Sequence, residues 1–264
     1  MADNRSLSNH VALVTGASRG IGRVIALRLA ERGVRIALHY RSNRDAAEAA
    51  LAQLAGTGHA IFAADLADPA ATTRLWQQVI DRFGAVNVLV NNAGLYVEHP
   101  PLTTGYESWQ SAWQLTLAAN LVGPANLSLL AAQHMGARAA PVDEWFGRGR
   151  IVNISSRGAF RGEPDCPAYA ASKAGLNALS QSLAKGLAPR AIYVYCLAPG
   201  WVETEMAAGH LGGPEGPAIL AQHPLGRVNQ SDEIAQATVY CALDAPAAMT
   251  GCVIDVNGAS YLRT

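Results

Sequence analysis

The sequence is poor in cysteine, in charge and in long apolar runs, and each shortage excludes a class of protein. Its cysteines form no C-x-x-C pair and have no metal-ligand spacing, so neither a zinc site nor a redox dithiol is expected. Twenty basic residues balance twenty acidic ones, so no net field attracts nucleic acid or an anionic membrane. No uninterrupted apolar run approaches the length of a membrane span. We therefore expect a soluble protein of the reducing cytoplasm that binds a small molecule, with no metal, nucleic acid or membrane involved.

What the sequence has in abundance is hydrophobic residues. They make up 50% of the 264 residues and charged residues only 15%, a balance that suits a sheet covered by helices on both faces. An α/β chain of this length often stays a single domain and can bury a large core. The first residues are polar and lack the apolar segment of a signal peptide. These features predict a flexible tail over residues 1–8 and one domain over 9–264.

Short apolar runs alternate along the chain with longer stretches of helical period. The runs that predict buried strands span residues 11–15, 35–40, 60–64, 86–91, 151–155, 192–197 and 252–256. The helical stretches span about 20–32, 44–54, 70–83, 108–135, 167–187 and 231–242. This alternation predicts an α/β fold with a doubly wound parallel sheet, whose ligands gather at the carboxyl ends of the strands. The segments 136–149 and 207–227 follow neither pattern, and no role is assigned to the first.

A glycine-rich turn follows the first predicted strand. Gly16, Gly20 and Gly22 lie where this strand must turn into a helix. Glycine lets the backbone approach a pyrophosphate at the helix N-terminus, since it has no Cβ. The spacing is G-x-x-x-G-x-G rather than the commoner G-x-G-x-x-G. Such a turn is weak evidence alone, because any tight connection between strand and helix can use one.

Tyr169 and Lys173 begin a predicted helix and share one face of it, being four residues apart. A phenol loses its proton near pKa ~10, and a neighbouring ammonium favours the phenolate. The pair can therefore act as an acid/base catalyst. Ser156 ends the strand before this helix, where its hydroxyl can hydrogen-bond a substrate carbonyl, although Ser155 competes for that role. An isolated tyrosine and lysine at this spacing would be read as two surface residues.

Together these residues resemble the short-chain dehydrogenase/reductase family, from about Val11 to Gly258. The motifs that match occur in the family's order, and they are Thr15-Gly-x-x-x-Gly-Ile-Gly22, Asp65-Leu66, Asn91-Asn-Ala-Gly94, Asn120, Ile154-Ser-Ser156, Tyr169-x-x-x-Lys173 and Pro199-Gly-x-x-x-Thr204. Seven motifs in order leave little room for chance. The resemblance implies a Rossmann fold and an NAD(P)-dependent oxidoreductase that acts on a carbonyl or a secondary alcohol.

The resemblance also implies a role for each catalytic position. The family's serine lies thirteen residues before its tyrosine, which selects Ser156. Tyr169 would be the acid in reduction and the base in oxidation. Lys173 would lower the pKa of Tyr169 and hold the nicotinamide ribose, and Asn120 would anchor a water molecule that links Lys173 to solvent. Asn120 stands inside a long predicted helix, where asparagine is unfavourable unless its side chain is used.

The positions implied for cofactor binding lie after five of the predicted strands. They are Gly16, Ser18, Arg19, Gly20, Ile21 and Gly22 in the glycine turn; Tyr40, Arg41 and Ser42 after the second strand; Asp65 and Leu66 at the adenine; Asn92, Ala93 and Gly94 along the adenosine; and Pro199, Gly200, Val202 and Thr204 at the nicotinamide, with Tyr169 and Lys173. Asp65 has an alternative interpretation as a cap of the next helix.

The charge after the second strand predicts that NADP(H) is preferred over NAD(H). Dinucleotide folds specific for NAD carry an acidic residue there that binds the ribose 2′-hydroxyl and repels a 2′-phosphate. This sequence has Tyr40 at that position, followed by Arg41 and Ser42, and its next carboxylate is Asp45. Arg41, Ser42 and Arg19 are therefore expected to hold the 2′-phosphate.

The substrate is less constrained. The segment 206–224 corresponds to the family's lid. The overall similarity favours a 3-oxoacyl thioester as substrate, with Arg148, Arg150 and Arg190 as candidates for docking an acyl-carrier protein. Alternatives are a pteridine reductase, which Gly20 and Ser156 disfavour, a polyol or steroid dehydrogenase, and a non-catalytic NAD(P)-binding regulator. Arg157 and Arg161 either reach an anionic substrate or, as is commoner for arginine, are solvated or ion-paired.

The assembly is expected to be a homo-oligomer, a tetramer or a dimer. Members of the family usually pair through two long helices, here 108–135 and 167–187. The second of these predicted helices carries small residues that permit close contact between helices, namely Ala168, Ala171, Ala174, Gly175 and Ala178.

Overall fold

A seven-stranded parallel sheet forms the centre of the computed structural model, which describes residues 7, 9–138, 143 and 145–263. The strand order is β3-β2-β1-β4-β5-β6-β9, so the chain reverses direction across the sheet between β1 and β4, as in a doubly wound fold. The strands are β1 (Val11–Val14), β2 (Arg35–Tyr40), β3 (Ala60–Ala63), β4 (Val88–Asn91), β5 (Gly149–Ile154), β6 (Ile192–Pro199) and β9 (Val253–Val256). The predicted fold class is confirmed.

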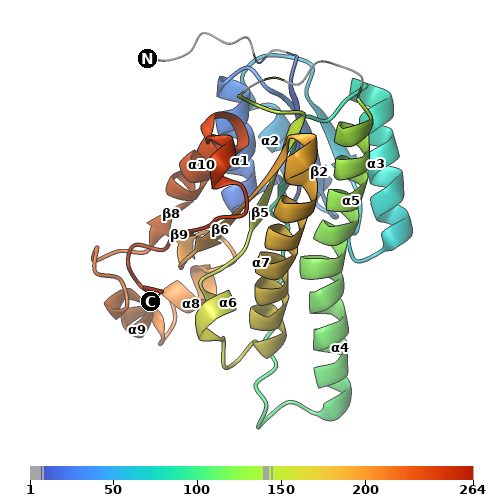
Figure 1. The fold of residues 1–264 in the computed structure, drawn as a ribbon. Coiled ribbons are helices and arrows are strands. Elements are labelled where there is room, and N and C mark those ends of the chain that lie inside the picture. Colours follow the sequence, from blue (N-terminus) through green and yellow to red (C-terminus); the bar gives the residue numbers. More distant parts are fainter. Residues whose placement is uncertain (1–6, 8, 139–142, 144, 264) are drawn as a thin grey trace.

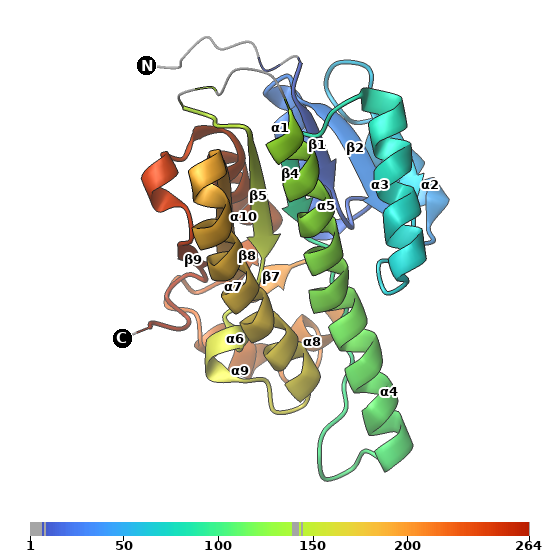
Figure 2. The same ribbon diagram turned by 45° about the vertical axis from the view of Figure 1, so that its right-hand side comes forward.

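Helices cover both faces of this sheet (Figures 1 and 2). One face carries α1 (Gly20–Glu31), α2 (Arg44–Leu51) and α10 (Ser231–Val239). The other carries α3 (Pro69–Phe83), α5 (Gly123–Ala137) and α7 (Pro167–Leu187), with α4 (Tyr106–Leu117) continuing the line of α5 beyond the sheet. Short helices α6 (Gly158–Arg161), α8 (Ala208–Leu211) and α9 (Gly216–Ala221) lie at the carboxyl end of the strands.

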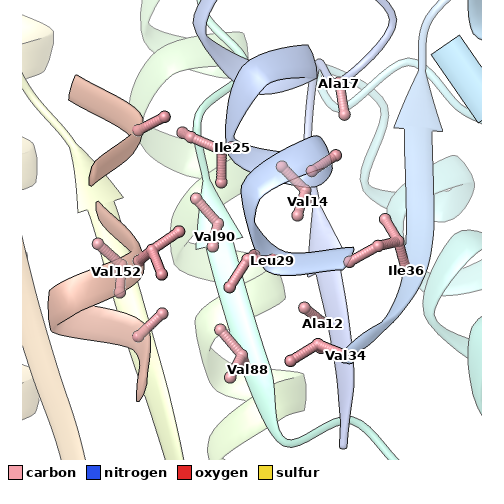
Figure 3. Packing of buried hydrophobic residues seen from close by; sticks show 14 of the residues in the cluster. Ala12, Val14, Ala17, Ile25, Leu29, Val34, Ile36, Val88, Val90 and Val152 are labelled. Carbon is pink, nitrogen blue, oxygen red and sulfur yellow. The ribbon is translucent and has the colours of Figure 1, made fainter. Parts of the chain in front are cut away.

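Alternate side chains of each central strand enter two separate cores. In β1, Ala12 and Val14 pack in the core beneath α1, whereas Val11 and Leu13 pack in the core beneath α3 and α5. Figure 3 shows the first core, where Ile25 and Leu29 of α1 lie over β1 and β4. Each such fully buried aliphatic side chain stabilises the fold by about 1.5–3 kcal/mol. Burial on both faces explains why these strands are continuous apolar runs.

The long helix predicted at 108–135 is in fact two α-helices joined by a π-helical turn, Ala118–Val122. The segment Tyr106–Ala137 as a whole is apolar and long enough to cross a membrane, which the sequence had not indicated because polar residues interrupt it. A core helix of a soluble protein passes the same test, and α5 packs here against β4, β5 and α3. Length and composition alone are therefore weak evidence of a membrane span.

The predicted lid stands between two short strands that the sequence did not reveal. Strand β7 (Val202–Glu203) pairs in parallel with β8 (Asn229–Gln230) and brings the two ends of the lid together. Most of the predicted tail, residues 1–6 and 8, lies outside the described residues, as do 139–142 and 144 of the unassigned segment 136–149. Leu7 is described, and it packs against the core beneath α1.

Candidate active site

A cavity of about 820 Å³ opens at the carboxyl ends of the strands, where the fold class predicts ligands. It extends from Arg41 beside α2 to Tyr96 and His210 near the lid. The predicted positions that line it are Gly16, Ser18, Arg19, Gly20, Ile21, Gly22, Arg41, Ser42, Asp65, Leu66, Asn92, Ala93, Gly94, Ser156, Tyr169, Lys173, Pro199, Gly200, Val202 and Thr204. Tyr40 and Asn120 do not line it.

The backbone of the glycine turn is open to close contact with a ligand. Gly16 adopts a left-handed conformation (φ 63°), which favours glycine. A Cβ on Gly22 would lie 2.4 Å from the carbonyl oxygen of Gly16 and from Nδ2 of Asn92. Asn92 Nδ2 donates to the carbonyl of Thr15 at 2.9 Å, and the Thr15 hydroxyl accepts from the amides of Asn92 and Ala93. The turn and the loop after β4 are thus one rigid cradle at the N-terminus of α1, which fits a pyrophosphate.

His39 also supports the glycine turn, and the sequence analysis missed it. Its Nδ1 accepts from the amide of Gly16 at 3.1 Å, and its Nε2 lies 3.0 Å from the carbonyl of Ala64. One ring nitrogen therefore accepts while the other donates, which describes a neutral imidazole. Burial lowers the pKa of His39 to about 4 and so keeps it neutral. The only available signal was a histidine inside an apolar strand.

The neighbour of His39 does not take the place predicted for it. Tyr40 is 7% exposed and packs in the core beneath α1. Consecutive residues of a strand point to opposite faces, so when His39 faces the glycine turn Tyr40 must face away. Tyr40 is therefore corrected from a cofactor contact to a core residue.

The two arginines predicted to read a 2′-phosphate are exposed and line the same cavity as Ser42. Arg41 has no ion pair among the described residues. Arg19 pairs with Glu205, which directly precedes the lid, at 3.4 Å, with both side chains more than 60% exposed. An exposed pair of this kind is weak. Glu205 is an acidic neighbour of the predicted phosphate site that the local sequence after β2 could not reveal.

The structure separates the two serines that end β5. Ser155 is 3% exposed and donates its hydroxyl to the carbonyl of Lys173 at 3.2 Å. Ser156 is half-buried at the cavity wall, where its hydroxyl accepts from the amide of Gly158 at 3.0 Å and interacts with Tyr169. Both serines line the cavity, but the Ser155 hydroxyl ties the strand to α7, whereas the Ser156 hydroxyl interacts with Tyr169.

Burial governs the protonation of the other two catalytic candidates. It raises the pKa of Tyr169 to about 12, and the interaction with Ser156 opposes this rise. It lowers the pKa of Lys173 to about 8. The Lys173 ammonium donates to the carbonyl of Ile154 at 2.8 Å and lies 5.7 Å from the centre of the Tyr169 ring. The implied lowering of the tyrosine pKa by Lys173 is therefore not seen in this arrangement, where Ser156 has that effect.

Asn120 lies in the π-helical turn, a feature often found at functional sites. It is fully buried, and its amide bonds the backbone of Leu95 in both directions, accepting at 2.7 Å and donating at 2.9 Å. Gly94 lies between this amide and Lys173. The observed task of the side chain is to hold the loop after β4.

Aromatic side chains form the end of the cavity nearest Tyr169. The Tyr96 ring meets the Tyr169 ring edge-on at 5.0 Å. His210 of the lid packs against Tyr96 at 5.8 Å and Trp201 at 5.4 Å. The same imidazole lies 3.5 Å from both Glu98 and Glu215. This end can therefore bury an apolar body next to the acid/base pair.

Two of the arginines predicted as surface residues are buried. Arg150 has no exposed surface, and its guanidinium donates to the carbonyls of Trp145, Phe146 and Cys241. It cannot dock a carrier protein, so that prediction is wrong. Arg157 is 2% exposed, which corrects the expectation of a solvated side chain, and it lines the cavity.

Comparison with known proteins agrees with this geometry. A family model described as enoyl-(acyl carrier protein) reductase matches residues 16–259. The 3-oxoacyl-[acyl-carrier-protein] reductase of Staphylococcus aureus is 35% identical over 253 residues, 95% of this chain and 98% of its own, and the enzyme of that name from Escherichia coli is 35% identical over 252 residues, 96% and 97%. The chain belongs to the short-chain dehydrogenase/reductase family. Its activity class follows from this: it is an NAD(P)-dependent oxidoreductase that acts on carbonyl and alcohol groups.

A solved structure of a short-chain dehydrogenase extends this agreement to the fold. This structure, from Burkholderia cenocepacia and in complex with NADP, superposes with a TM-score of 0.83 at 30% identity and covers 97% of this chain and 99% of its own. Ser156, Tyr169 and Lys173 all line the cavity, and a non-catalytic NAD(P)-binding regulator needs no such acid/base group. The enzyme is favoured over that alternative.

Proposed function

We propose that this enzyme transfers hydride between NADPH and a carbonyl or secondary alcohol of a small molecule. One observation carries the proposal: the wall that holds Ser156, Tyr169 and Lys173 belongs to the same cavity that ends at Arg19 and Arg41. The residues at one end of this cavity, Tyr169 and Lys173, would hold the nicotinamide end of a dinucleotide, and the arginines would hold its 2′-phosphate. The cradle at Gly16 and Gly22 suits the pyrophosphate between them.

The side chains at the redox end have separate tasks in carbonyl reduction. The bound nicotinamide supplies the hydride, and the protein supplies position and a proton. The Ser156 hydroxyl holds the carbonyl oxygen, and Tyr169 gives that oxygen its proton. The raised pKa of Tyr169 keeps the proton available at neutral pH. Lys173, held by the carbonyl of Ile154, would bind the ribose hydroxyls beside the nicotinamide and so orient its ring. In alcohol oxidation the proton moves the other way.

The preference for NADPH over NADH rests on charge. Arg41 has no carboxylate partner among the described residues, and the partner of Arg19 is weakly held. Guanidinium groups bind phosphate oxygens through pairs of N–H donors. The complex of the Burkholderia cenocepacia relative with NADP supports the same cofactor here.

A 3-oxoacyl thioester is the substrate class that the relatives' names support. The apolar end formed by Tyr96 and Trp201 can accommodate an acyl chain. Docking of an acyl-carrier protein would use Arg190, which is exposed, and Arg148. A cytoplasmic location is part of the proposal, and the four cysteines, all free, suit a reducing compartment.

A substrate panel tests this function. Purified enzyme is mixed with NADPH and, separately, with acetoacetyl thioesters, simple ketones, a pterin and a steroid, while the nicotinamide absorbance is followed. We expect oxidation of NADPH with a carbonyl substrate and a higher kcat/KM for NADPH than for NADH. No turnover of any carbonyl by folded protein that binds NADPH would contradict the proposal.

A further inference from the structure

Arg157 is a buried cation at the substrate end that the proposed chemistry does not use. It follows Ser156 directly, lines the cavity and is 2% exposed. Its guanidinium donates to Oε1 of Gln222 at 2.9 Å and to the carbonyl of Ser260 at 3.4 Å. Both acceptors are neutral, and the described part of the chain contains no ion pair of Arg157. A buried charge without a counter-ion is costly, so its retention calls for a reason.

A second guanidinium points to the same acceptor. Arg161 donates to Oε1 of Gln222 at 3.3 Å, so this one amide oxygen receives donors from two arginines. The other arm of Arg161 pairs with Glu163 at 3.3 Å. Two positive charges thus face one carboxylate, which leaves one positive charge uncompensated. The position of Oε1 is one that a negatively charged oxygen would occupy more favourably than a neutral one.

His223 on the same side of the cluster reports this excess of positive charge. It is 3% exposed; its Nδ1 bonds the carbonyl of Ile219 at 2.9 Å, and its buried Nε2 has no hydrogen-bond partner in the described structure. Burial first, and then the charges of Arg157 and Arg161, lower the pKa of His223. An anion bound at the two arginines would offset their charges and raise the pKa of His223, so that Nε2 could take up a proton and donate a hydrogen bond.

We propose that Arg157 binds an anionic group of the substrate, and that the substrate is therefore a carbonyl compound that carries a carboxylate. The inference rests on the proposed function, since it concerns the same cavity. Arg157 lines the cavity, whereas Arg161 and Gln222 do not, so a substrate carboxylate reaches the pair through Arg157 and displaces the Gln222 amide oxygen from it. It then accepts from the guanidinium in the fork geometry that arginine offers. Tyr96 and Trp201 then cover the apolar body between the carboxylate and the reacting carbonyl.

The position in the chain favours a carboxylate of the substrate itself over the phosphate of a carrier arm. Arg157 is the residue next to Ser156, which holds the carbonyl oxygen. Arg157 and Ser156 line the same cavity, so a carboxylate on a short substrate can reach Arg157 while its carbonyl lies at Ser156. The phosphate of a pantetheine arm instead lies at the far end of a long linker from its thioester. An assay with free oxo acids and with coenzyme A thioesters distinguishes a carboxylate from a phosphate as the bound anion.

The test compares matched acids and esters. Oxo acids of increasing chain length, together with 3- and 4-acetylbenzoate, are assayed against their methyl esters with saturating NADPH. For the best acid we expect kcat/KM about 10-fold or more above that of its ester, the size of one charge-assisted hydrogen bond. Acetoacetyl-coenzyme A is compared in the same way with its neutral N-acetylcysteamine analogue, which tests whether a phosphate is the preferred anion. A preference confined to the coenzyme A thioester, or no preference for any anion, would overturn the proposal.

Three variants locate the effect. In Arg157→Met the preference for the acid should fall to near unity, and Gln222→Glu should do the same by placing a carboxylate of the protein between the two arginines. Gln222→Glu should also raise the melting temperature, because it supplies the missing counter-ion. Arg74→Met, which removes an exposed arginine outside the cavity, is the matched control.

The design keeps the two proposals distinguishable. If Arg157→Met does not fold, Gln222→Glu decides, and retention of the full acid preference in that variant would refute the anion site. Turnover of the neutral esters by wild-type enzyme reports on the proposed function alone. If the wild-type enzyme turns over neither esters nor acids, the result counts against carbonyl reduction. If it turns over esters but does not prefer acids, the result counts only against the anion site at Arg157.

Discussion

At the scale of single residues, Tyr169 carries the clearest prediction. Replacement by phenylalanine removes only the hydroxyl that gives up the proton, and the ring can keep its contact with Tyr96. We expect Tyr169→Phe to lower kcat by roughly two orders of magnitude or more, the usual loss when general acid catalysis is removed. Fluorescence titration with NADPH and a thermal melt should be nearly unchanged. Near-native kcat in the folded variant would remove Tyr169 from the mechanism.

Arg41 and Arg19 carry the prediction on cofactor choice. Alanine at either position should raise the KM for NADPH far more than the KM for NADH. The expected loss of binding free energy for NADPH is about 1.5–3 kcal/mol per charged contact. The effect of Arg19→Ala should be the smaller one, because Glu205 already shares that guanidinium. Steady-state kinetics with both cofactors measure this, and Arg74→Ala serves as control. Equal losses for the two cofactors would show that the arginines do not bind the phosphate.

His39 predicts a pH dependence of stability. Its pKa of about 4 in the folded protein lies below the ordinary 6.5, so as the pH falls the unfolded chain binds the proton first. The stabilisation is complete above about pH 6.5 and is lost on the way down to about pH 4, by roughly 3 kcal/mol in all. The free energy of unfolding in urea, measured at several pH values, should show this loss in wild type.

The variant His39→Gln isolates this contribution from the other buried histidines. Glutamine can also accept from the amide of Gly16 and donate to Ala64, but it does not titrate. The difference in unfolding free energy between variant and wild type should therefore change with pH over the same window. A difference that is constant with pH would show that His39 is not held neutral.

At the scale of elements, the π-helical turn between α4 and α5 places Asn120 against the loop after β4. Asn120→Ala would leave the amide and the carbonyl of Leu95 without their buried partners, which costs about 1–3 kcal/mol for each group left unpaired. We expect a lower melting temperature together with a lower kcat, because this loop also carries Gly94 beside Lys173. Gln114→Ala, an exposed change on α4, is the control. An unchanged melting temperature would contradict the structural role.

The elements themselves follow from their sequences for identifiable reasons. Helix α3 begins where Asp68 caps it and Pro69 takes its first position, and it ends at Gly84, whose φ is 75°. The small sheet of β7 and β8 could not be predicted, since two-residue strands have no periodicity. The π-helical turn was missed for a related reason: its residues keep the helical pattern, and only the backbone hydrogen bonds shift.

At the scale of the whole molecule, the outer face of the α4–α5 line predicts assembly. Leu115, Val122 and Leu129 are 42%, 45% and 54% exposed and follow one another at intervals of seven residues. Apolar side chains in such a row are commonly covered by another subunit. We expect light scattering to show a homo-oligomer, and Val122→Arg to shift it towards smaller species. A wild-type monomer at micromolar concentration would contradict the prediction.

The sequence by itself determined the order of strands and helices, the glycine turn and the spacing of Ser156 to Tyr169, because each of these depends on residues close together in the chain. It did not determine which way the side chains of the central strands point. Both faces of the sheet are buried, so apolar residues occur without alternation and Tyr40 could not be told from His39 by pattern.

Only the tertiary structure decided what the arginines do. Arg150 is buried by carbonyls that come from residues 145, 146 and 241, and Arg157 by Gln222 and Ser260. Burial of a charged group depends on partners far away in the chain, and composition predicts only that arginine is usually exposed. Long-range partners likewise set Glu205 beside Arg19 and His39 beside Gly16. Local motifs thus predicted the catalytic residues of the site. Its electrostatics depend on contacts between residues far apart in the chain, which form only in the folded protein.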